Sequence, residues 1–451
     1  MEKIGIALSG GGHRASLFAI GVLLYLVDVG KNRELCSISS VSGGSLTNGY
    51  LAQWGKFSSC SPEEFEKEIR PLVRRLATKG TLWGWSWIRV YLLLTIMLGI
   101  ATCAVWLGPW GLFLRLGLFV VGILATFELF LQRGRLCGRA FAATLFRPSG
   151  SATKLSDTAN RNIDHIICAT DLHAGEHVYF SGNFVCSYRF GWGKPGNLPL
   201  HVAVQTSAAF PCGFPARWLS AKQHDFQNGT QEDASWIVLS DGGVYDNMGE
   251  QWFSGIQTRK RRYKSLAVGI QEPQLLILVN SSANIPWSGL GKLRIPILGE
   301  LLTMLRVILV LHDNTTTVRR RWLFDRFKRS ASTGEGLRGA FVTIEQTPQS
   351  VARQICSPSE RAVFPPEMVK RAEELLRFIK SRSAENWEAI AEANSRVATT
   401  LRSLGPRTGA ALIRHAYVLA MCNLHVIFDF PLGELPTLDD IYKRLMPDLP
   451  H

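Results

Sequence analysis

The chain has 451 residues, 46% of them hydrophobic, and a formal net charge of +14 at pH 7. This length can bury a sizeable core and allows two or three domains, while the charge suits an anionic partner, either nucleic acid or a membrane surface. The nine cysteines have no paired C-x-x-C spacing, which argues against a disulfide framework or a zinc site and favours a reducing cytoplasm.

The first segment of the chain predicts a strand, a tight turn and a helix. Residues 4–8 are apolar as in a buried strand, residues 10–12 are three glycines, and residues 15–27 carry apolar side chains at helical spacing. Backbone N–H groups at such a turn and helix start point at one spot, where they can hold a developing oxyanion. Because the chain opens directly on this strand, we expect no signal peptide.

A second strand-like run ends at Ser42, which has small residues two positions away on both sides, Ser40 and Gly44. A nucleophile elbow needs such small neighbours, because its serine lies on a strained turn between a strand and a helix. The run departs from the G-x-S-x-G pattern only in having serine at its first position. Each motif alone is also compatible with an ordinary glycine turn, but together they indicate a serine hydrolase.

Residues 82–133 predict a helical hairpin. Two uncharged stretches, 90–114 and 116–127, are separated by Arg115, and a Gly/Pro turn lies at 108–111. Helices of about 18 to 20 residues match the thickness of a bilayer. We therefore expect a transmembrane insertion, with Arg115 reaching the far interface; a buried helix pair in a soluble enzyme is the alternative. The following tryptophans and cations flank the hairpin and place both flanks on the cytoplasmic side: Trp83, Trp85, Trp87, Arg74, Arg75, Lys79, Arg133, Arg135 and Arg139.

A third motif begins at Asp241, which follows the strand-like run 236–240 and precedes Gly242 and Gly243. The two glycines let the carboxylate lie against another backbone, as a base that faces Ser42 requires. The ten histidines show no triad context. His13 is expected to be a loop side chain, and His173 and His177 lie in a strand-like region, where a spacing of four does not pair metal ligands.

The order of glycine-rich loop, serine elbow and D-G-G resembles the order of these motifs in the patatin-like phospholipases. The resemblance covers residues 1–80 and 135–285 and is weaker around His415. The resemblance implies a three-layer α/β/α fold with a central, mostly parallel sheet, and no metal or cofactor. It also implies that Ser42 is the nucleophile and Asp241 its base. The resemblance further implies roles for these residues: Gly10, Gly11 and Gly12 as the oxyanion hole, and Arg14, Gly44, Gly242 and Gly243 as accessory residues.

The C-terminal part, about 286–451, is expected to be helical and basic. Residues 296–311 and 319–329 suit anionic headgroups, or form a solvated basic face. Residues 365–403 predict a helical layer, and residues 330–339 predict a flexible loop. The predicted catalytic domain thus comprises residues 1–81 and 134–451, interrupted by the hairpin.

We therefore expect a membrane-associated lipid acyl hydrolase that acts through an acyl-enzyme and faces the cytoplasm, at the inner membrane if the source is bacterial. Its expected partner is an anionic phospholipid membrane rather than nucleic acid, and homo-oligomerisation stays open. One alternative is a catalytically silent lipid-binding or membrane scaffold. The other is a dinucleotide-binding oxidoreductase, because residues 10–15 also satisfy G-x-G-x-x-A.

Overall fold

A mixed β-sheet forms the centre of the structure. The computed structural model describes residues 2–146, 150–159, 162–211, 213–230, 235–263, 270–282 and 298–449. The described residues hold an 11-stranded sheet with the order β11-β10-β1-β2-β3-β4-β5-β6-β8. The pairs from β11 to β3 are parallel, and the remaining pairs are antiparallel, including those of β9 with β3 and β7. The parallel centre and the α/β class agree with the sequence-based prediction.

The bounds of the strands are as follows. The parallel strands are β1 (Ile4–Leu8), β2 (Leu35–Val41), β3 (Asp164–Asp171), β10 (Leu275–Asn280) and β11 (Arg338–Thr343). The antiparallel strands are β4 (Glu176–Phe180), β5 (Val185–Ser187), β6 (Gly191–Gly193), β7 (Arg217–Ser220), β8 (Gln227–Asn228) and β9 (Trp236–Asp241).

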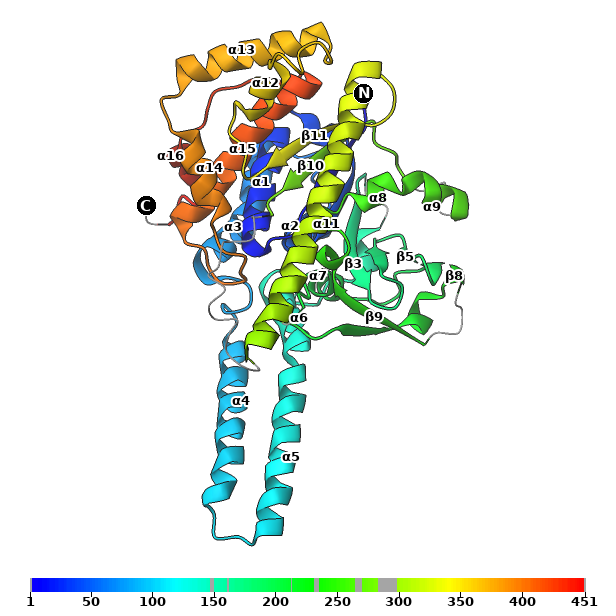
Figure 1. The fold of residues 1–451 in the computed structure, drawn as a ribbon, viewed down its shortest axis with the longest axis vertical. Helices are drawn as coiled ribbons and strands as arrows, with labels where there is room; N and C mark the ends of the chain where they lie inside the picture. The colour runs from blue at the N-terminus through cyan, green and yellow to red at the C-terminus, as the bar shows by residue number, and fades with distance from the viewer. Residues whose placement is uncertain are drawn as a thin grey trace.

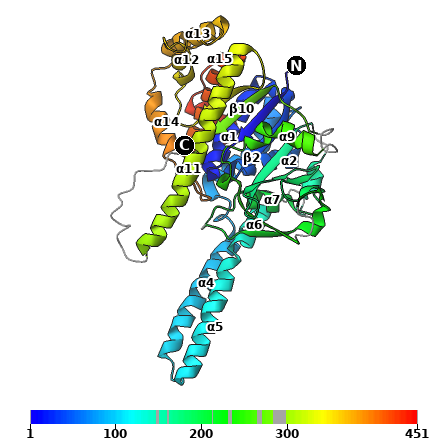
Figure 2. The same cartoon turned by 45° about the vertical axis from the view of Figure 1, so that its right-hand side comes forward.

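Helices cover both faces of the sheet, as Figures 1 and 2 show. Alternate residues of β1 explain this layering, because Ile4 and Ile6 pack into one apolar cluster and Ala7 packs into another. A strand that is buried on both faces has the continuous apolar sequence seen here. Helices of the first face include α1 (Gly12–Asp28), α2 (Gly43–Trp54), α3 (Pro62–Arg74) and α15 (Pro406–Phe428), and helices of the second include α8 (Gln251–Ser254), α9 (Ile256–Arg262) and α11 (Leu298–Thr333).

The core of the first face is the crossing of α1 and α15. A Cβ atom at Gly21 of α1 would lie 2.2 Å from the carbonyl oxygen of Ile413, so the absence of a side chain there permits the close approach. Helix α15 is long and apolar enough to cross a membrane, but 72% of its most apolar window is buried inside the body. Its apolar character therefore serves the core.

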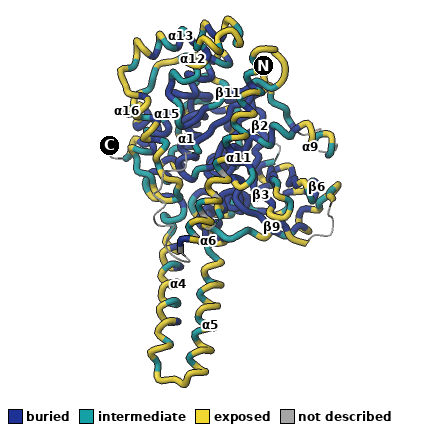
Figure 3. The backbone as a smooth tube through the Cα atoms, in the orientation of Figure 1, coloured by how far each residue is buried: buried dark blue, intermediate teal, exposed yellow. Residues whose placement is uncertain are grey.

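The predicted hairpin projects from the body as two antiparallel helices, α4 (Ser86–Ala104) and α5 (Leu112–Leu131). Both are long and apolar enough to cross a membrane, and only 11% and 0% of their most apolar windows are buried. Figure 3 shows the exposed surface of both helices. The helices contact each other near the body, where the Tyr91 hydroxyl donates to the carbonyl oxygen of Leu129 at 2.9 Å. Helix α6 (Arg133–Thr144) then returns the chain to the body.

The C-terminal part agrees with the prediction only in part. The expected loop 330–339 is shorter in the structure and comprises residues 334–337, because α11 continues to Thr333 and β11 begins at Arg338. The basic run 319–329 is not a freely solvated face, because Leu323 and Phe327 on the same helix are buried. The expected helical layer 365–403 is confirmed as two helices with an irregular end. Residues 286–297 lie outside the described residues. The remaining helices of this part are α12 (Ser350–Ile355), α13 (Pro366–Arg382), α14 (Trp387–Ser395) and α16 (Leu438–Leu445).

Candidate active site

Ser42 lies on a sharp turn between β2 and α2. Its backbone angles are φ 50° and ψ −117°, a strained conformation for a residue other than glycine. A Cβ atom at Gly44 would lie 2.7 Å from the Leu8 carbonyl oxygen, and one at Gly43 would lie 2.1 Å from the Gly12 carbonyl oxygen. The elbow therefore requires glycine after the serine, as the motif predicted for Gly44, and it packs directly on the glycine loop.

Buried hydrogen bonds explain why serine replaces glycine at position 40. The Ser40 hydroxyl accepts from Asn48 Nδ2 at 2.8 Å and from Ser45 Oγ at 3.0 Å, and it donates to the Ile166 carbonyl oxygen at 3.1 Å. These bonds tie β2, α2 and β3 together below the elbow. The departure from the glycine pattern thus contributes to holding the turn.

A further hydroxyl, to which the sequence motifs assigned no role, supports the elbow from α7 (Leu200–Ser207). Ser207 Oγ accepts from the Ser42 backbone N–H at 3.0 Å and donates to the Cys168 carbonyl oxygen at 2.6 Å. The strained residue is therefore anchored through its own N–H group. Only the fold brings Ser207 to this position, since it lies far from Ser42 in the sequence.

The strand registers bring Asp241 to Ser42. Strands β2 and β9 share one edge of β3, because Val41 pairs with Cys168 and Asp241 pairs with the next residue of β3, Ala169. Strand β2 runs parallel to β3 and β9 runs antiparallel, so their carboxyl ends meet. Gly242 fits this meeting point, because a Cβ atom there would lie 2.4 Å from the Cys168 carbonyl oxygen.

The carboxyl group of Asp241 is buried. Its Oδ1 accepts from the Gly243 N–H at 2.8 Å, while its Oδ2 has no hydrogen bond of standard geometry among the described residues. Burial raises the pKa of Asp241 to about 7, and the Gly243 N–H and the nearby Ser42 hydroxyl offset part of this rise. The carboxyl group can therefore take up or release a proton near neutral pH.

The glycine loop has two N–H groups without a hydrogen bond among the described residues. Gly11 and Gly12 have φ values of 137° and 60°, which favour glycine. The Gly10 N–H donates to the Asn247 carbonyl oxygen at 2.9 Å, so it is not free for an oxyanion as the family pattern implied. Within the described part of the chain no hydrogen bond occupies the N–H groups of Gly11, Gly12 and Gly43, which leaves these three as candidate oxyanion donors.

Arg14 and His13 hold the glycine loop in place. Arg14 is buried, and its guanidinium donates to the carbonyl oxygens of Ser281, at 3.0 Å, and Val397. His13 contacts the Arg402 carbonyl oxygen through Nδ1 at 2.7 Å and the Thr81 hydroxyl through Nε2 at 2.9 Å. Burial lowers the pKa of His13 to about 4, so a neutral ring with both nitrogens occupied is a structural element of the loop.

A histidine on β4 supports the D-G-G turn from its other side. His177 Nε2 lies 3.0 Å from the Gly242 carbonyl oxygen, and its ring packs against Tyr245. Burial lowers the pKa of His177 to about 4, so the neutral ring can donate to this carbonyl. Among the described residues no three His, Cys, Asp or Glu side chains gather in a metal-binding arrangement.

The comparisons with known proteins place the chain in a family. Residues 6–251, more than half of the 451-residue chain, match the model of the patatin-like phospholipases, and the chain belongs to this family. The matched range contains the glycine loop, Ser42 and Asp241.

Two solved structures are similar at low identity. Human GIVD cytosolic phospholipase A2 shares 14% identity at a TM-score of 0.47, with 98% of this chain and 60% of that chain covered. VipD from Legionella pneumophila shares 11% identity at a TM-score of 0.30, with 98% and 79% covered. The chain thus spans less than two thirds of the length of the human protein. No curated protein matches the sequence.

Proposed function

We propose that the protein is a membrane-bound phospholipase A-type enzyme that cleaves acyl esters through an acyl-enzyme on Ser42, with Asp241 as the general base. One observation carries this proposal: the strained Ser42 and the buried Asp241 meet where β2 and β9 end on the same edge of β3. The family to which the chain belongs supports a lipid acyl ester as the substrate.

In the proposed reaction, Ser42 Oγ attacks the ester carbonyl carbon and its proton passes to Asp241. The N–H groups of Gly11, Gly12 and Gly43 would stabilise the oxyanion, and a single donor of this kind contributes about 10² to 10³ in rate. Collapse of the tetrahedral intermediate breaks the ester bond, and the leaving alcohol takes the proton from Asp241. Water then attacks the acyl-enzyme and gives one proton to Asp241. Collapse of this second intermediate breaks the bond to Ser42 Oγ, which takes the proton back from Asp241 as the fatty acid is released.

The burial of Asp241 suits this role. An aspartate in water has a pKa near 3.9 and is a weak base, whereas a pKa of about 7 lies close to the value at which a general base is most effective at neutral pH. The desolvation that raises the pKa thus strengthens the carboxylate as a proton acceptor for the Ser42 hydroxyl.

The hairpin supports membrane association of the enzyme. Helices α4 and α5 have 19 and 20 residues, which at about 1.5 Å per residue span roughly the 30 Å of a hydrocarbon core. Leu107 and Phe113 near the tip are 88% and 91% exposed, far more than a soluble protein usually leaves for large apolar side chains. We propose that residues 82–133 cross the membrane twice and leave the catalytic body on the cytoplasmic side, which is the inner membrane if the source is bacterial.

Helix α11 supports the same orientation. Its N-terminal end points toward the side of the body from which the hairpin projects (Figures 1 and 2). The apolar side chains of Met304, Val310 and Leu311 are exposed on this part of the helix. They would enter the interfacial layer of the membrane and, together with the positive charge of the chain, favour an anionic lipid surface.

The mechanism can be tested with paired substitutions in detergent-solubilised protein. We expect Ser42→Ala to abolish both phospholipid hydrolysis and labelling by a fluorophosphonate, and Asp241→Asn to lower turnover by about 10² to 10⁴. Ser59→Ala and Asp225→Asn change exposed residues and serve as matched controls with full activity. Hydrolysis that survives Ser42→Ala, or an active Asp241→Asn variant combined with loss of activity on a histidine substitution, would contradict the dyad.

A further inference from the structure

A cavity separate from the dyad lies at the edge of the sheet. It has a volume of about 570 Å³ and is enclosed by the C-terminal half of α11, strand β11 and residues of α12, α13 and α15. Strand β11 is the edge strand, separated from β2 by β10 and β1. This volume is in the range of about 300 to 1,000 Å³ that is usual for small-molecule sites. The catalytic mechanism above uses none of its residues.

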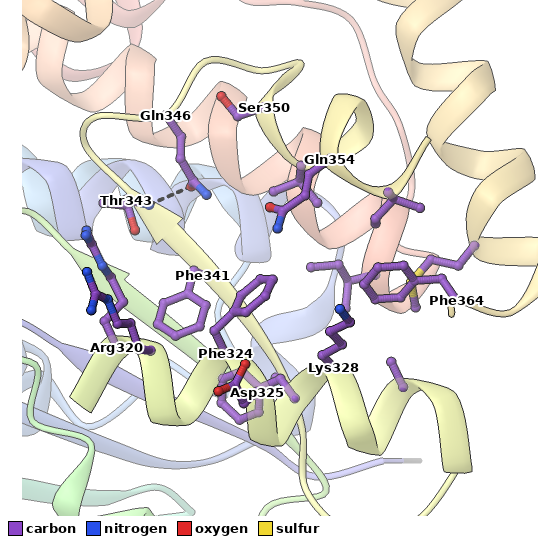
Figure 4. Close-up of a pocket in the computed structure, with 18 of the residues that line it drawn as sticks. Arg320, Phe324, Asp325, Lys328, Phe341, Thr343, Gln346, Ser350, Gln354 and Phe364 are labelled. Atoms are coloured by element: carbon purple, nitrogen blue, oxygen red, sulfur yellow. Dashed lines mark hydrogen bonds between the residues drawn. The ribbon is translucent and has the colours of Figure 1, made fainter. Parts of the chain in front are cut away.

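The lining of the cavity changes in polarity from one end to the other. Figure 4 shows Arg320, Thr343 and Gln346 at one end and Phe364 at the other, with Phe324 and Phe341 between them. The three phenylalanines are only half-buried, so they expose apolar ring surface to the cavity. Ile355 and Met368 add aliphatic surface. A ligand that fits this gradient has a polar head and an apolar body.

The polar end favours a negative charge. Arg320 pairs with Glu345 at 3.8 Å and its side chain is 40% exposed, which makes this ion pair weak. Arg321 and Asp325 also line the cavity, so its lining carries three cations, Arg320, Arg321 and Lys328, against the two carboxylates of Asp325 and Glu345. Lys328, further along α11, is held by Glu360 at 2.5 Å. The lining cations thus outnumber the lining carboxylates by one, and Arg320 lies at the same end as Thr343 and Gln346, whereas Asp325 lies beside Phe324 (Figure 4).

Gln346 adds a hydrogen-bond donor at the same end. Its Oε1 accepts from the Thr343 N–H at 2.9 Å and from Asn423 Nδ2 at 3.0 Å. With Oε1 occupied, the amide can offer only its Nε2 hydrogens to a ligand. A fixed amide donor at the same end as the Arg320 guanidinium is the chemistry that recognises a carboxylate or phosphate.

We propose that this cavity binds a single-chain anionic amphiphile, with its head at Arg320, Arg321 and Gln346 and its chain along Phe324 and Phe341 toward Phe364. A fatty acid and a lysophospholipid share this chemistry, and both are products of the reaction proposed above, on which the source of the ligand rests. A nucleotide fits less well, because its base would lie at the apolar end and leave its polar ring atoms unpaired.

A path of charges connects the cavity to the glycine loop. Glu345 also acts electrostatically on Arg14, and it favours the charged form of that guanidinium. Arg14 in turn holds Ser281 and Val397 around the loop.

Photolabelling of the full chain tests the site independently of catalysis. The Ser42→Ala protein in lipid nanodiscs is labelled with a palmitate analogue that carries a diazirine, and cross-linked peptides are mapped by mass spectrometry. We expect saturable labelling of the segments 320–331 and 338–355. Oleate and lysophosphatidate are the two competitors. The one that competes more strongly shows whether the ligand is a fatty acid with a carboxylate head or a lysophospholipid with a phosphate head. Failure of the proposed hydrolysis would not alter this result, because the variant is inactive by design.

Two variants and one control make the binding test decisive. Arg320→Ala should weaken labelling about tenfold, since it removes one charge-assisted anchor, and Val351→Trp should fill the cavity and abolish labelling. Arg326→Ala removes the same charge from the same helix, but Arg326 stacks on Trp322 and does not line the cavity, so it should label normally. Labelling elsewhere, labelling unchanged by both variants, or saturable labelling of these segments by 8-azido-ATP without competition by oleate would overturn the proposal.

Discussion

At the scale of single residues, the protonation of Asp241 links activity to pH. Because burial raises its pKa to about 7, the carboxyl group is neutral in acid and becomes a base as the pH rises. We expect kcat/KM to increase from pH 5 to pH 8 with a midpoint near 7 when measured with a soluble ester. A profile that is flat over this range would show that the base titrates far below neutrality and would contradict the role of desolvation.

The same residue predicts a pH-dependent stability. The folded-state pKa of Asp241 lies above the unfolded value of 3.8, so the native state binds the extra proton. Its contribution to the free energy of unfolding is fully present below about pH 4 and is lost as the pH rises through about 7. A shift of about three units corresponds to roughly 4 kcal/mol.

The amide of Asp241→Asn cannot ionise, so this variant should gain stability relative to the parent chain between pH 4 and pH 8. Thermal unfolding of both proteins in the same detergent at pH 4.5 and pH 8 measures the change. Asp225→Asn, at an exposed position, is the control and should show no such trend. Equal differences in melting temperature at both pH values would refute the prediction.

The residues of the site divide into those that the sequence revealed and those that only the fold supplies. Ser42, Asp241 and the glycines lie in local motifs, because a strained elbow and a tight turn constrain consecutive residues. Ser207 carries no such local signal, since its hydroxyl supports Ser42 only after α7 has packed beside β3. The Gly10 N–H donates to the Asn247 carbonyl oxygen and is therefore not available to an oxyanion. This hydrogen bond likewise depends on a contact between distant loops.

At the scale of elements, α11 shows how one helix can combine two patterns that look separate in the sequence. Its basic and aromatic stretch resembles a membrane-binding face, yet Leu323 and Phe327 are spaced by one helical turn and both are buried. That spacing was a usable signal for a continuous helix. The end of α11 was harder to predict, because the serines and threonine after Arg329 also favour a loop.

An ion pair joins α11 to the segment after the D-G-G turn. Arg319 Nη1 lies 3.1 Å from Glu250 Oε1, and the Glu250 side chain is only 1% exposed. Burial raises the pKa of Glu250, and Arg319 offsets part of the rise. We expect Arg319→Ala to destabilise the protein by about 3 to 5 kcal/mol, because it leaves a buried carboxylate without its partner.

Denaturant or thermal unfolding of the purified protein tests this link. The double variant Arg319→Gln with Glu250→Gln removes both charges and should recover most of the loss. Arg326→Ala, which removes a charge from the same helix without a buried partner, is the matched control. A stability of Arg319→Ala equal to that of Arg326→Ala would mean that the pair does not hold α11 on the body.

At the scale of the whole molecule, the long apolar helices lie in two different environments, either packed in the body or exposed outside it. Composition selects α4, α5 and α15 alike as possible membrane spans, and only their packing separates them. Helix α15 buries its surface against α1, with Gly21 permitting the contact, whereas the hairpin extends away from the body (Figure 3). The hairpin was recognisable in the sequence because a Gly/Pro turn separates two apolar stretches of bilayer length and cations flank them on both outer sides.

The proposed membrane insertion of the hairpin predicts how the protein behaves when membranes are washed. The full chain should stay in the membrane pellet through washes with high salt and with alkaline carbonate, because salt screens surface charges over about 10 Å at 0.1 M but does not weaken apolar burial. Shortening the hairpin should release the body. Residues 93–127 can be replaced by a short glycine-serine linker, since the hydrogen bond between Tyr91 and Leu129 keeps the two stems adjacent at that level. We expect this variant in the soluble fraction with its fluorophosphonate labelling intact. An intact chain that salt alone removes completely would be a peripheral protein, and the hairpin would then pack against another surface.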